Sequence, residues 1–340
     1  MTPGYYSQSL DGHRAAYLDF VVKRFGGERI QVGDLFRRSS VVMFLMIEEN
    51  FVLYVLSAFW RSILGRRTVG LLFRPGPTVQ RKTLKHLFKW LLLRILKLLP
   101  EVHTLSIVPI NFDERISLIV DNWIHDFQLW DISENEIILF NNIKNQYESD
   151  RFAENFTLFE KAKKHANGRP LLVALGMQTR NKGTEILARY ISNDVKRGWT
   201  VLVAGRFASD QQQSRQLIEA CGGLVIDKYL SDIEMIEVYA AADAVWCLYD
   251  PAYDQASGIL GRAIQLGVPT VVRDGSYSAK LCENEKINHI LIRKEMNLNI
   301  MKEKSNINNF DEIKKKTSNR GVRSAECLRK ALNIENLDIQ

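Results

Sequence analysis

Short apolar runs alternate with amphipathic segments through the second half of the chain, and this alternation restricts the possible folds more than any other feature. The runs that read as strands are Pro170–Leu175, Thr200–Ala204, Leu224–Ile226, Ala244–Leu248 and Pro269–Val272. The segments with helical spacing are Thr184–Val195, Ser214–Ala220, Ile233–Ala241 and Ile259–Gln265. Because the strands are apolar throughout, both faces of their sheet must be covered, which is typical of parallel sheets with right-handed crossovers. The pattern predicts a Rossmann-like half-domain from about Pro170 to Leu281.

The first half of the chain shows the same alternation less regularly. We expect strands at Val41–Ile47, Thr68–Phe73 and Thr104–Val108, and helices at Ala15–Phe25, Phe51–Leu64 and Thr83–Leu98. No apolar run precedes Asp11, so the first strand is either the polar stretch Gly4–Ser9 or missing.

A chain of 340 residues exceeds what one hydrophobic core usually supports, so two domains are expected. We predict an α/β protein with two Rossmann-like domains, residues 1–155 and 156–292, followed by a helical tail, residues 293–340. The charged, helix-prone stretch Asp150–Asn167 is expected to be the linker between the domains.

Charge and composition narrow the choice of partner. The net charge of +7 and an isoelectric point near 9.1 favour a nucleotide diphosphate, an acidic lipid surface or nucleic acid. Nucleic acid is disfavoured because no basic stripe interleaved with aromatic residues occurs, and a dinucleotide dehydrogenase because GxGxxG is absent. The four cysteines are too far apart for a zinc site or a disulfide framework, which favours a reducing cytoplasm.

Membrane insertion is also disfavoured. The N-terminal segment Met1–Asp11 is polar, which argues against a signal peptide. The longest apolar stretch, Phe51–Trp60, is far shorter than the roughly 20 residues that span a bilayer. We therefore expect a cytoplasmic protein.

Three strand-to-helix loops carry the residues best suited to bind an anion, because ligands of parallel α/β sheets lie beyond the carboxyl ends of the strands. The first loop runs from Gly176 to Gly183 and contains Arg180 and Lys182. The second, Asp254–Gly258, leads into a helix, and the third is Gly205-Arg206. Each also has a plainer interpretation: a solvated basic loop, an N-cap at Ser257, or a turn glycine.

These loops, taken in order, resemble the C-terminal domain of GT-B-fold glycosyltransferases of group 1 (family 4-like). The matching stretches are Leu175-Gly176 with Lys182-Gly183, Val201–Gly205, Tyr229–Asp232 with Tyr239–Asp243, and Ser257-Gly258 with Gly267–Val272. The resemblance implies two Rossmann-like domains facing a cleft, parallel sheets flanked by helices, and a nucleotide-diphosphate sugar as donor substrate. No further cofactor or metal ion is expected, because lysine and arginine can neutralise the diphosphate.

The resemblance also implies roles for single residues. Arg180 and Lys182 would hold the diphosphate, and Ser257 and Gly258 would bind it at the helix start. The other residues implied are the Asp227–Tyr229 turn against the base, and Asp254 and Gln255 at the sugar or ribose. All of this depends on the loop of Lys182 and the helix after Ser257 converging on one phosphate site.

Two positions depart from the family pattern. Met177 stands where an arginine commonly follows the first loop glycine, and Arg262 where many retaining members have a second glutamate. The ribose contact and the stereochemical outcome therefore stay open. So does a second hypothesis, that the protein binds a nucleotide or a partner without turnover.

The first domain offers candidate bases. Asp11 and His13 precede a predicted helix in the loop that would follow the first strand, and a histidine there could accept a proton from an acceptor hydroxyl. His125, next to Asp126, is a second candidate. A capping or packing role is the alternative for each.

The segment Arg81–Lys97, extended to residue 99, contains six lysines and arginines and no acid before Glu101. On a helix Arg81, Lys82, Lys85 and Lys89 share one face, with Leu84, Leu87, Phe88 and Leu91 opposite. This is typical of a helix in an anionic membrane interface, although a domain helix with a basic surface has the same pattern. We therefore expect a glycosyltransferase acting on a glycan or lipid-linked acceptor in cell-surface polysaccharide biosynthesis, peripheral on the inner face of the membrane.

Overall fold

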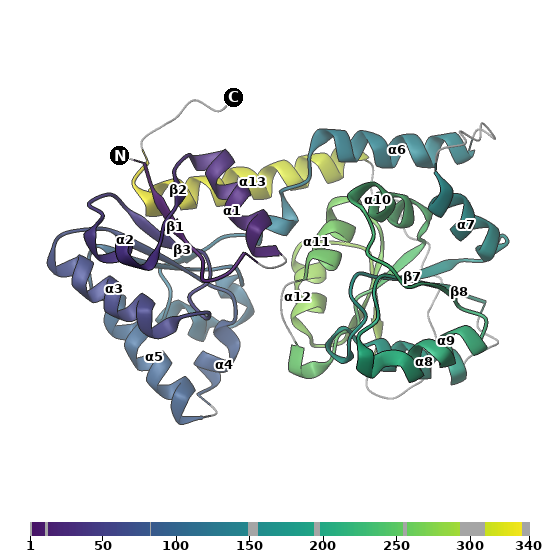
Figure 1. Ribbon diagram of the computed structural model, residues 1–340, viewed down its shortest axis with the longest axis horizontal. Helices are drawn as coiled ribbons and strands as arrows, with labels where there is room; N and C mark the ends of the chain where they lie inside the picture. Colours follow the sequence, from purple (N-terminus) through teal and green to yellow (C-terminus); the bar gives the residue numbers. More distant parts are fainter. Residues whose placement is uncertain are drawn as a thin grey trace. The chain divides into compact units, whose positions relative to one another are not determined.

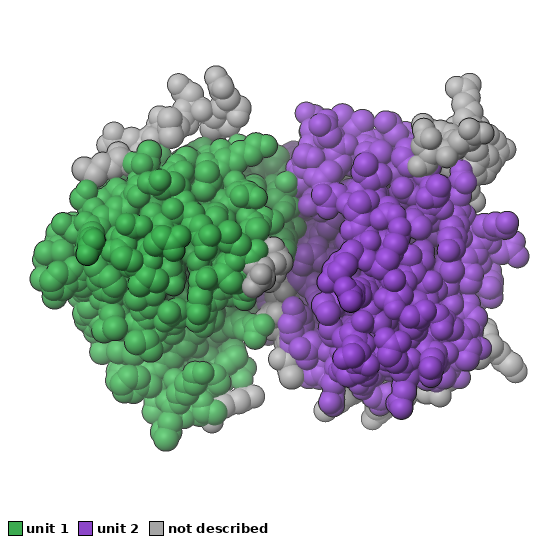
Figure 2. Space-filling model, viewed as in Figure 1, with its two compact units in different colours: residues 1–131, 316–340 green, residues 132–315 purple. Residues whose placement is uncertain are grey.

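The computed structural model describes residues 2–10, 13–81, 83–148, 156–193, 198–253, 257–292 and 310–334. The chain forms two compact units, which Figure 2 shows in different colours. Unit 1 consists of residues 1–131 and 316–340, and unit 2 of residues 132–315. The domain boundaries expected from the sequence, after residues 155 and 292, are thus not where these units divide.

Unit 1 is built on a parallel six-stranded sheet with the order β2-β1-β3-β4-β5-β6. Its strands are β1 (Gly4–Tyr6), β2 (Glu28–Arg29), β3 (Val42–Phe44), β4 (Thr68–Leu72), β5 (Val102–Ser106) and β6 (Asn122–Trp123). Its helices are α1 (His13–Phe25), α2 (Val32–Arg37), α3 (Phe51–Ile63), α4 (Pro75–Gln80) and α5 (Leu84–Leu96). Short 3₁₀ turns follow β5 and β6.

The first strand is present, as the short segment Gly4–Tyr6 between β2 and β3. All three of its residues are buried, and it pairs with both β2 and β3. The possibility that this strand is missing was therefore wrong. The sequence pattern of this strand is weak because two tyrosines, and not aliphatic residues, supply the apolar surface of the strand.

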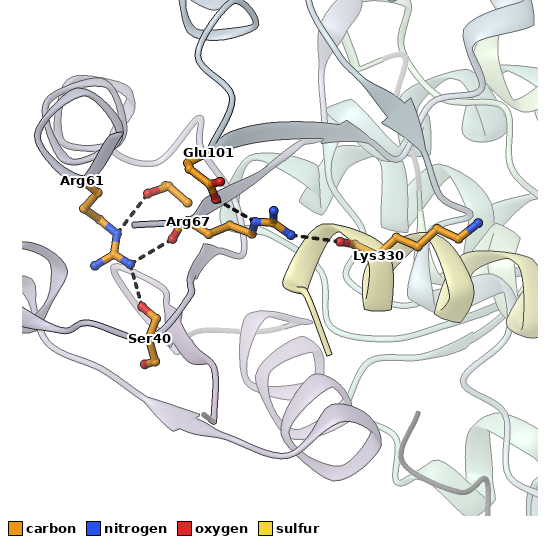
Figure 3. A network of polar contacts seen from close by, with 6 residues as sticks. Ser40, Arg61, Arg67, Glu101 and Lys330 are labelled. Atoms are coloured by element: carbon orange, nitrogen blue, oxygen red, sulfur yellow. Dashed lines mark hydrogen bonds and ion pairs between the residues drawn. The ribbon is translucent and has the colours of Figure 1, made fainter. Parts of the chain in front are cut away.

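A buried arginine ties the loops of unit 1 together at the amino ends of the strands. The Arg61 guanidinium is fully buried and donates hydrogen bonds to Thr68 Oγ1 and to four backbone carbonyl oxygens, of which Figure 3 shows those of Ser40 and Arg67. Those carbonyls belong to Leu35, Arg38, Ser40 and Arg67. Burial lowers the pKa of Arg61 to about 10, and the five hydrogen bonds offset part of the cost of burying this charge.

The helix α13 (Phe310–Leu332) packs on unit 1, although it comes last in the chain (Figure 1). Arg67 joins it to the sheet, since its guanidinium contacts Glu101 at 3.1 Å and the Lys330 carbonyl at 3.4 Å (Figure 3). The side chains of Leu328 and Leu332 in α13 are buried. Gly321 lies against Trp130, whose ring leaves almost no room for a Cβ atom.

Unit 2 contains the second parallel six-stranded sheet, with the order β12-β11-β10-β7-β8-β9. Its strands are β7 (Leu171–Leu175), β8 (Thr200–Ala204), β9 (Leu224–Ile226), β10 (Ala244–Trp246), β11 (Thr270–Arg273) and β12 (His289–Ile292). Its helices are α6 (Glu134–Glu148), α7 (Thr157–Ala166), α8 (Thr184–Asn193), α9 (Gln212–Ala220), α10 (Asp232–Ala241), α11 (Gly258–Gln265) and α12 (Tyr277–Asn284). The five strands and four helices expected between Pro170 and Val272 are confirmed.

The expected linker is in part a packed helix of unit 2. Within Asp150–Asn167, residues 156–167 are described, and most of them form α7. This helix buries Leu158, Phe159 and Ala162, and Glu237 of α10 accepts hydrogen bonds from two amides of its first turn, at 2.8 and 3.0 Å. The linker interpretation was therefore wrong here, because the lysines that suggested a solvated connection occupy only the outer face.

No helix within the described ranges is both long and apolar enough to cross a lipid bilayer.

Candidate functional site

The order of strands in unit 2 creates a switch point between β7 and β10. From β7 the chain proceeds to β8 and β9, whereas from β10 it proceeds in the opposite direction to β11 and β12. Right-handed crossovers then place α8 and α9 on one face of the sheet and α10, α11 and α12 on the other, and Figure 1 shows this separation. Loops that follow two adjacent strands at such a point leave space for a ligand beyond the strand ends.

Close-packed glycines hold the loops at this edge. Gly176 (φ +82°) ends β7, and Gly205 (φ +141°) ends β8; a Cβ atom on Gly205 would lie 1.9 Å from the Gly176 carbonyl oxygen. Gly183 (φ +74°) closes the β7 loop, and a Cβ atom there would lie 2.0 Å from the carbonyl oxygen of Leu248. Glycine is therefore required where these backbones meet.

The β7 loop and the start of α11 come together through side chains. Lys182 Nζ donates a hydrogen bond of 2.9 Å to Ser257 Oγ, directly before α11. The same ammonium lies 4.6 Å from the ring centre of Tyr249 and 5.2 Å from that of Tyr253. The two segments on which the sequence argument depended thus do converge, with polar and aromatic groups between them.

Ser257 does not cap its helix with its side chain. Its hydroxyl lies instead 2.7 Å from the Tyr249 hydroxyl, besides accepting the hydrogen bond from Lys182. Burial holds the pKa of Tyr249 well above its ordinary value, so this phenol stays protonated and can donate. The first N–H groups of α11 receive no side-chain cap from Ser257, and helix N-termini of this kind attract anions.

The third loop lies beside the first. The Gln178 amide donates to the Arg206 carbonyl at 2.8 Å, and the Ala208 amide donates to the Gln178 carbonyl at 2.9 Å. The Arg206 guanidinium lies 5.4 Å from the ring of Tyr229, which is 71% exposed. A cation and an exposed aromatic ring therefore stand together near the loop that carries Lys182.

The remaining predicted donor residues have these positions. Arg180 is exposed on the 3₁₀ turn Arg180–Lys182, and Gly258 is the first residue of α11. Asp227 anchors the third loop, since its carboxylate accepts a hydrogen bond of 3.0 Å from the Phe207 amide. Asp254 and Gln255 lie outside the described residues.

The candidate bases belong to unit 1, and their roles stay predictions. Asp11 lies outside the described residues, and His13 is the first residue of α1, with a side chain outside the description. His125 is buried where α13 packs: its Nδ1 lies 3.3 Å from Ser324 Oγ, and its ring lies 4.9 Å from that of Trp123.

Sequence reasoning missed several residues at these edges. Tyr249 directly follows the predicted strand Ala244–Leu248 and Tyr253 lies in the loop after it, and this place beyond a strand end was the available signal. In unit 1, Glu49 follows β3, forms an ion pair with Arg14 and accepts a hydrogen bond of 3.1 Å from the Gln8 amide. It thereby holds the loop after β1, at the switch point between β1 and β3.

Two Rossmann-like sheets define an α/β protein, and the cationic and aromatic cluster at the switch point of the second has the composition that an anionic ligand requires. No protein-family model and no curated protein sequence matches the chain. Solved structures match it over nearly its whole length.

HepE of Anabaena, in complex with UDP, is 14% identical to this chain with a TM-score of 0.56, over 98% of this chain and 96% of HepE. In complex with UDP and glucose, the same protein gives 14% identity and a TM-score of 0.54, over 97% and 95%. The N-terminal domain of a trehalose-6-phosphate phosphatase of Candida albicans is 9% identical with a TM-score of 0.57, over 95% and 78%.

These similarities show the fold. The two parallel sheets with their flanking helices are those of the GT-B glycosyltransferases. Since the same fold also matches a domain of a protein named as a phosphatase, the activity has to be argued from the site.

Proposed function

We propose that this protein is a glycosyltransferase that moves a sugar from a nucleotide-diphosphate donor to a glycan or lipid-linked acceptor, in cell-surface polysaccharide biosynthesis. The observation that carries the proposal is the meeting of Lys182 with Ser257 at the start of α11. HepE, which has this fold, was solved with UDP and with UDP and glucose, and this supports a uridine nucleotide as the first donor class to examine.

The chemistry follows from the charges at the switch point. When the bond between sugar and diphosphate breaks, negative charge grows on the leaving phosphate oxygens. Lys182, the exposed Arg180 and the N–H groups of α11 would stabilise that charge, and fixed positioning of donor and acceptor would supply much of the remaining rate enhancement. In this proposal the cationic side chains neutralise the diphosphate in place of a metal ion, so activity should survive chelation of divalent metals.

Other parts of the donor have candidate partners as well. Tyr229 beside Arg206 offers an exposed ring against which a base could stack. Asp254 and Gln255 remain the candidates for the sugar or ribose. Asp11 and His13 remain the candidates for accepting a proton from the acceptor hydroxyl.

Calorimetry of UDP binding tests the proposal. We expect Lys182→Ala, or Ser257→Ala, to weaken UDP binding by about 10- to 100-fold, because a hydrogen bond to a charged group contributes about 1.5–3 kcal/mol. The matched control is Lys161→Ala, which removes an exposed lysine from α7 of the same unit and should bind as the wild type does. Unchanged binding by Lys182→Ala would reject the donor site.

A second candidate, binding without turnover, is favoured by Arg262. Its guanidinium contacts Gln265 at 3.0 Å and Glu136 at 3.4 Å, both within unit 2, so this position supplies a packing cation where many retaining transferases have a carboxylate. At the other departing position, Met177 is exposed where group 1 GT-B glycosyltransferases commonly have an arginine. Nucleotide binding with neither sugar transfer nor donor hydrolysis over a broad donor panel would support this candidate.

A further inference from the structure

Two helices of unit 1, α3 and α5, lie side by side on one face of its sheet. The chain passes from β3 to β4 and on to β5 in the same direction across the sheet. Successive right-handed crossovers in one direction place their helices on the same face, and Figure 1 shows α3 and α5 as neighbours. Lys89 Nζ of α5 lies 5.1 Å from the ring of Phe51 at the start of α3, so the helices are in contact.

The outer surface of this helix pair is apolar. Its exposed side chains recur every three or four residues, as one face of a helix requires. They include Leu56, Trp60 (49% exposed) and Ile63 (78%) on α3, and Leu84 (85%), Phe88 (64%) and Leu91 on α5. By contrast, α5 buries only Leu93 and Leu96. An exposed apolar surface of this kind is typical of a docking site.

The same region is strongly basic. The fifty residues from Phe51 to Pro100 contain ten lysines and arginines and no aspartate or glutamate; Arg61 among them is buried and Arg67 pairs with Glu101, so the surface charge comes from the others. Since the whole chain has a net charge of +7, the other 290 residues together carry −3. Arg81, Lys85 and Arg94 are exposed, and the guanidiniums of Arg81 and Arg94 lie 5.1 and 5.2 Å from the ring of Trp90.

We propose that the outer face of α3 and α5 docks on an anionic lipid bilayer. The leucines, Ile63 and Phe88 would enter the boundary between headgroups and acyl chains, with Trp60 at the interface and the cations on the lipid phosphates. This requires α3 as well as the basic segment 81–99 recognised in the sequence. The inference does not depend on the proposed donor chemistry, and it supplies a surface at which a lipid-linked acceptor can be reached.

Charge decides between the possible occupants. A second copy of the chain would bring two positive surfaces together, which costs free energy. Nucleic acid would neutralise the cations but leave the apolar side chains in water. An anionic bilayer satisfies both the charged and the apolar groups.

Co-sedimentation of the full-length protein with lipid vesicles tests the proposal. The wild type should bind vesicles of phosphatidylcholine with phosphatidylglycerol, bind phosphatidylcholine alone much less, and lose binding as salt is added. Leu84→Ser combined with Phe88→Ser should weaken binding by about tenfold or more, because two apolar side chains would no longer leave water for the bilayer. Lys85→Glu combined with Arg94→Glu should remove the preference for phosphatidylglycerol.

The matched control is Ile138→Ser combined with Ile233→Ser, which removes two exposed apolar residues from α6 and α10 and should leave vesicle binding unchanged. Absence of vesicle binding, or binding unaffected by Leu84→Ser with Phe88→Ser, would overturn the proposal. So would a lipid-free dimer that these substitutions dissociate. UDP affinity, measured on the same variants, should stay that of the wild type, which separates this proposal from the donor site.

Discussion

At the scale of single residues, the candidate donor site is held in place by contacts within unit 2. Lys182 is fixed by one hydroxyl and by the faces of two tyrosine rings. A lysine side chain ordered in this way loses little further conformational entropy when it contacts a phosphate, which favours binding. The residue that matters for its position, besides Ser257, is therefore Tyr249.

Asp126 of unit 1 leads to a prediction about pH. Its carboxylate is buried and accepts hydrogen bonds from the Tyr17 hydroxyl and the Gln128 amide. Burial, with a smaller contribution from Asp131, raises the pKa of Asp126 from 3.8 to about 6. Between these values the folded protein binds a proton that the unfolded chain does not, so this group stabilises the fold at low pH and the effect is lost as pH rises through about 6.

We expect Asp126→Asn to remove this dependence, because the amide oxygen still accepts both hydrogen bonds but does not ionise. From about pH 4 to about pH 7 the wild type should lose about 1–3 kcal/mol of stability relative to the variant. Urea unfolding of both proteins at several pH values measures the difference. Parallel curves for the two proteins would contradict the buried-carboxyl explanation.

At the scale of elements, the site depends on how tightly the strand-end loops approach one another. Gly183→Ala should destabilise unit 2 and weaken UDP binding, because its Cβ atom would collide with the Leu248 backbone in addition to the cost of a positive φ. Gly168→Ala is the matched control: Gly168 has φ +76° but no atom within 4 Å of its added Cβ atom. The control should cost about 1–2 kcal/mol and Gly183→Ala clearly more, as measured by chemical unfolding.

The sequence predicted the elements of unit 2 well because its central strands are apolar on both faces, which leaves little choice of structure. It predicted the meeting of Lys182 and Ser257 for a related reason, since parallel strands that are neighbours carry their loops to one edge. It did not identify Tyr249, because a tyrosine after a strand has the same pattern whether it packs in the core or positions a ligand group.

Elements with little apolar surface were predicted only in part: the first strand was one of two alternatives, Asp150–Asn167 was expected to be helix-prone but not packed, and the helical tail was expected without its contacts. The strand Gly4–Tyr6 contributes only two tyrosine rings, and α7 buries four residues among lysines. The packing of α13 on unit 1 rests on Arg67, Ser324 and a few small or aliphatic residues in a sequence rich in charge. Such contacts depend on partners far away in the sequence, which local patterns do not reveal.

At the scale of the whole molecule, the units are interwoven in sequence, since unit 2 lies between the two parts of unit 1. Removal of residues 316–340 should therefore destabilise unit 1 by about 5 kcal/mol or more, because several buried apolar side chains of α13 lose their contacts. Hydrogen exchange should speed up in β4, β5 and β6, while β7, β8 and β10 keep their protection.

A milder change serves as a check on that deletion. Leu328→Ala, at a fully buried position of α13, should cost about 2–5 kcal/mol in unit 1, whereas Val322→Ala, at an exposed position of the same helix, should cost little. Equal loss of protection in both units would show that they do not unfold separately.

The position of α13 also has a consequence for synthesis on the ribosome. Unit 2 has all of its strands once residue 292 has left the exit tunnel, and its core can form while translation continues. The sheet of unit 1 is synthesised first, but the surface that Leu328 and Leu332 cover stays exposed until α13 has left the tunnel. Synthesis of unit 1 thus starts before that of unit 2, but its folding is completed later. A nascent chain stalled before residue 316 exposes that apolar surface to chaperones.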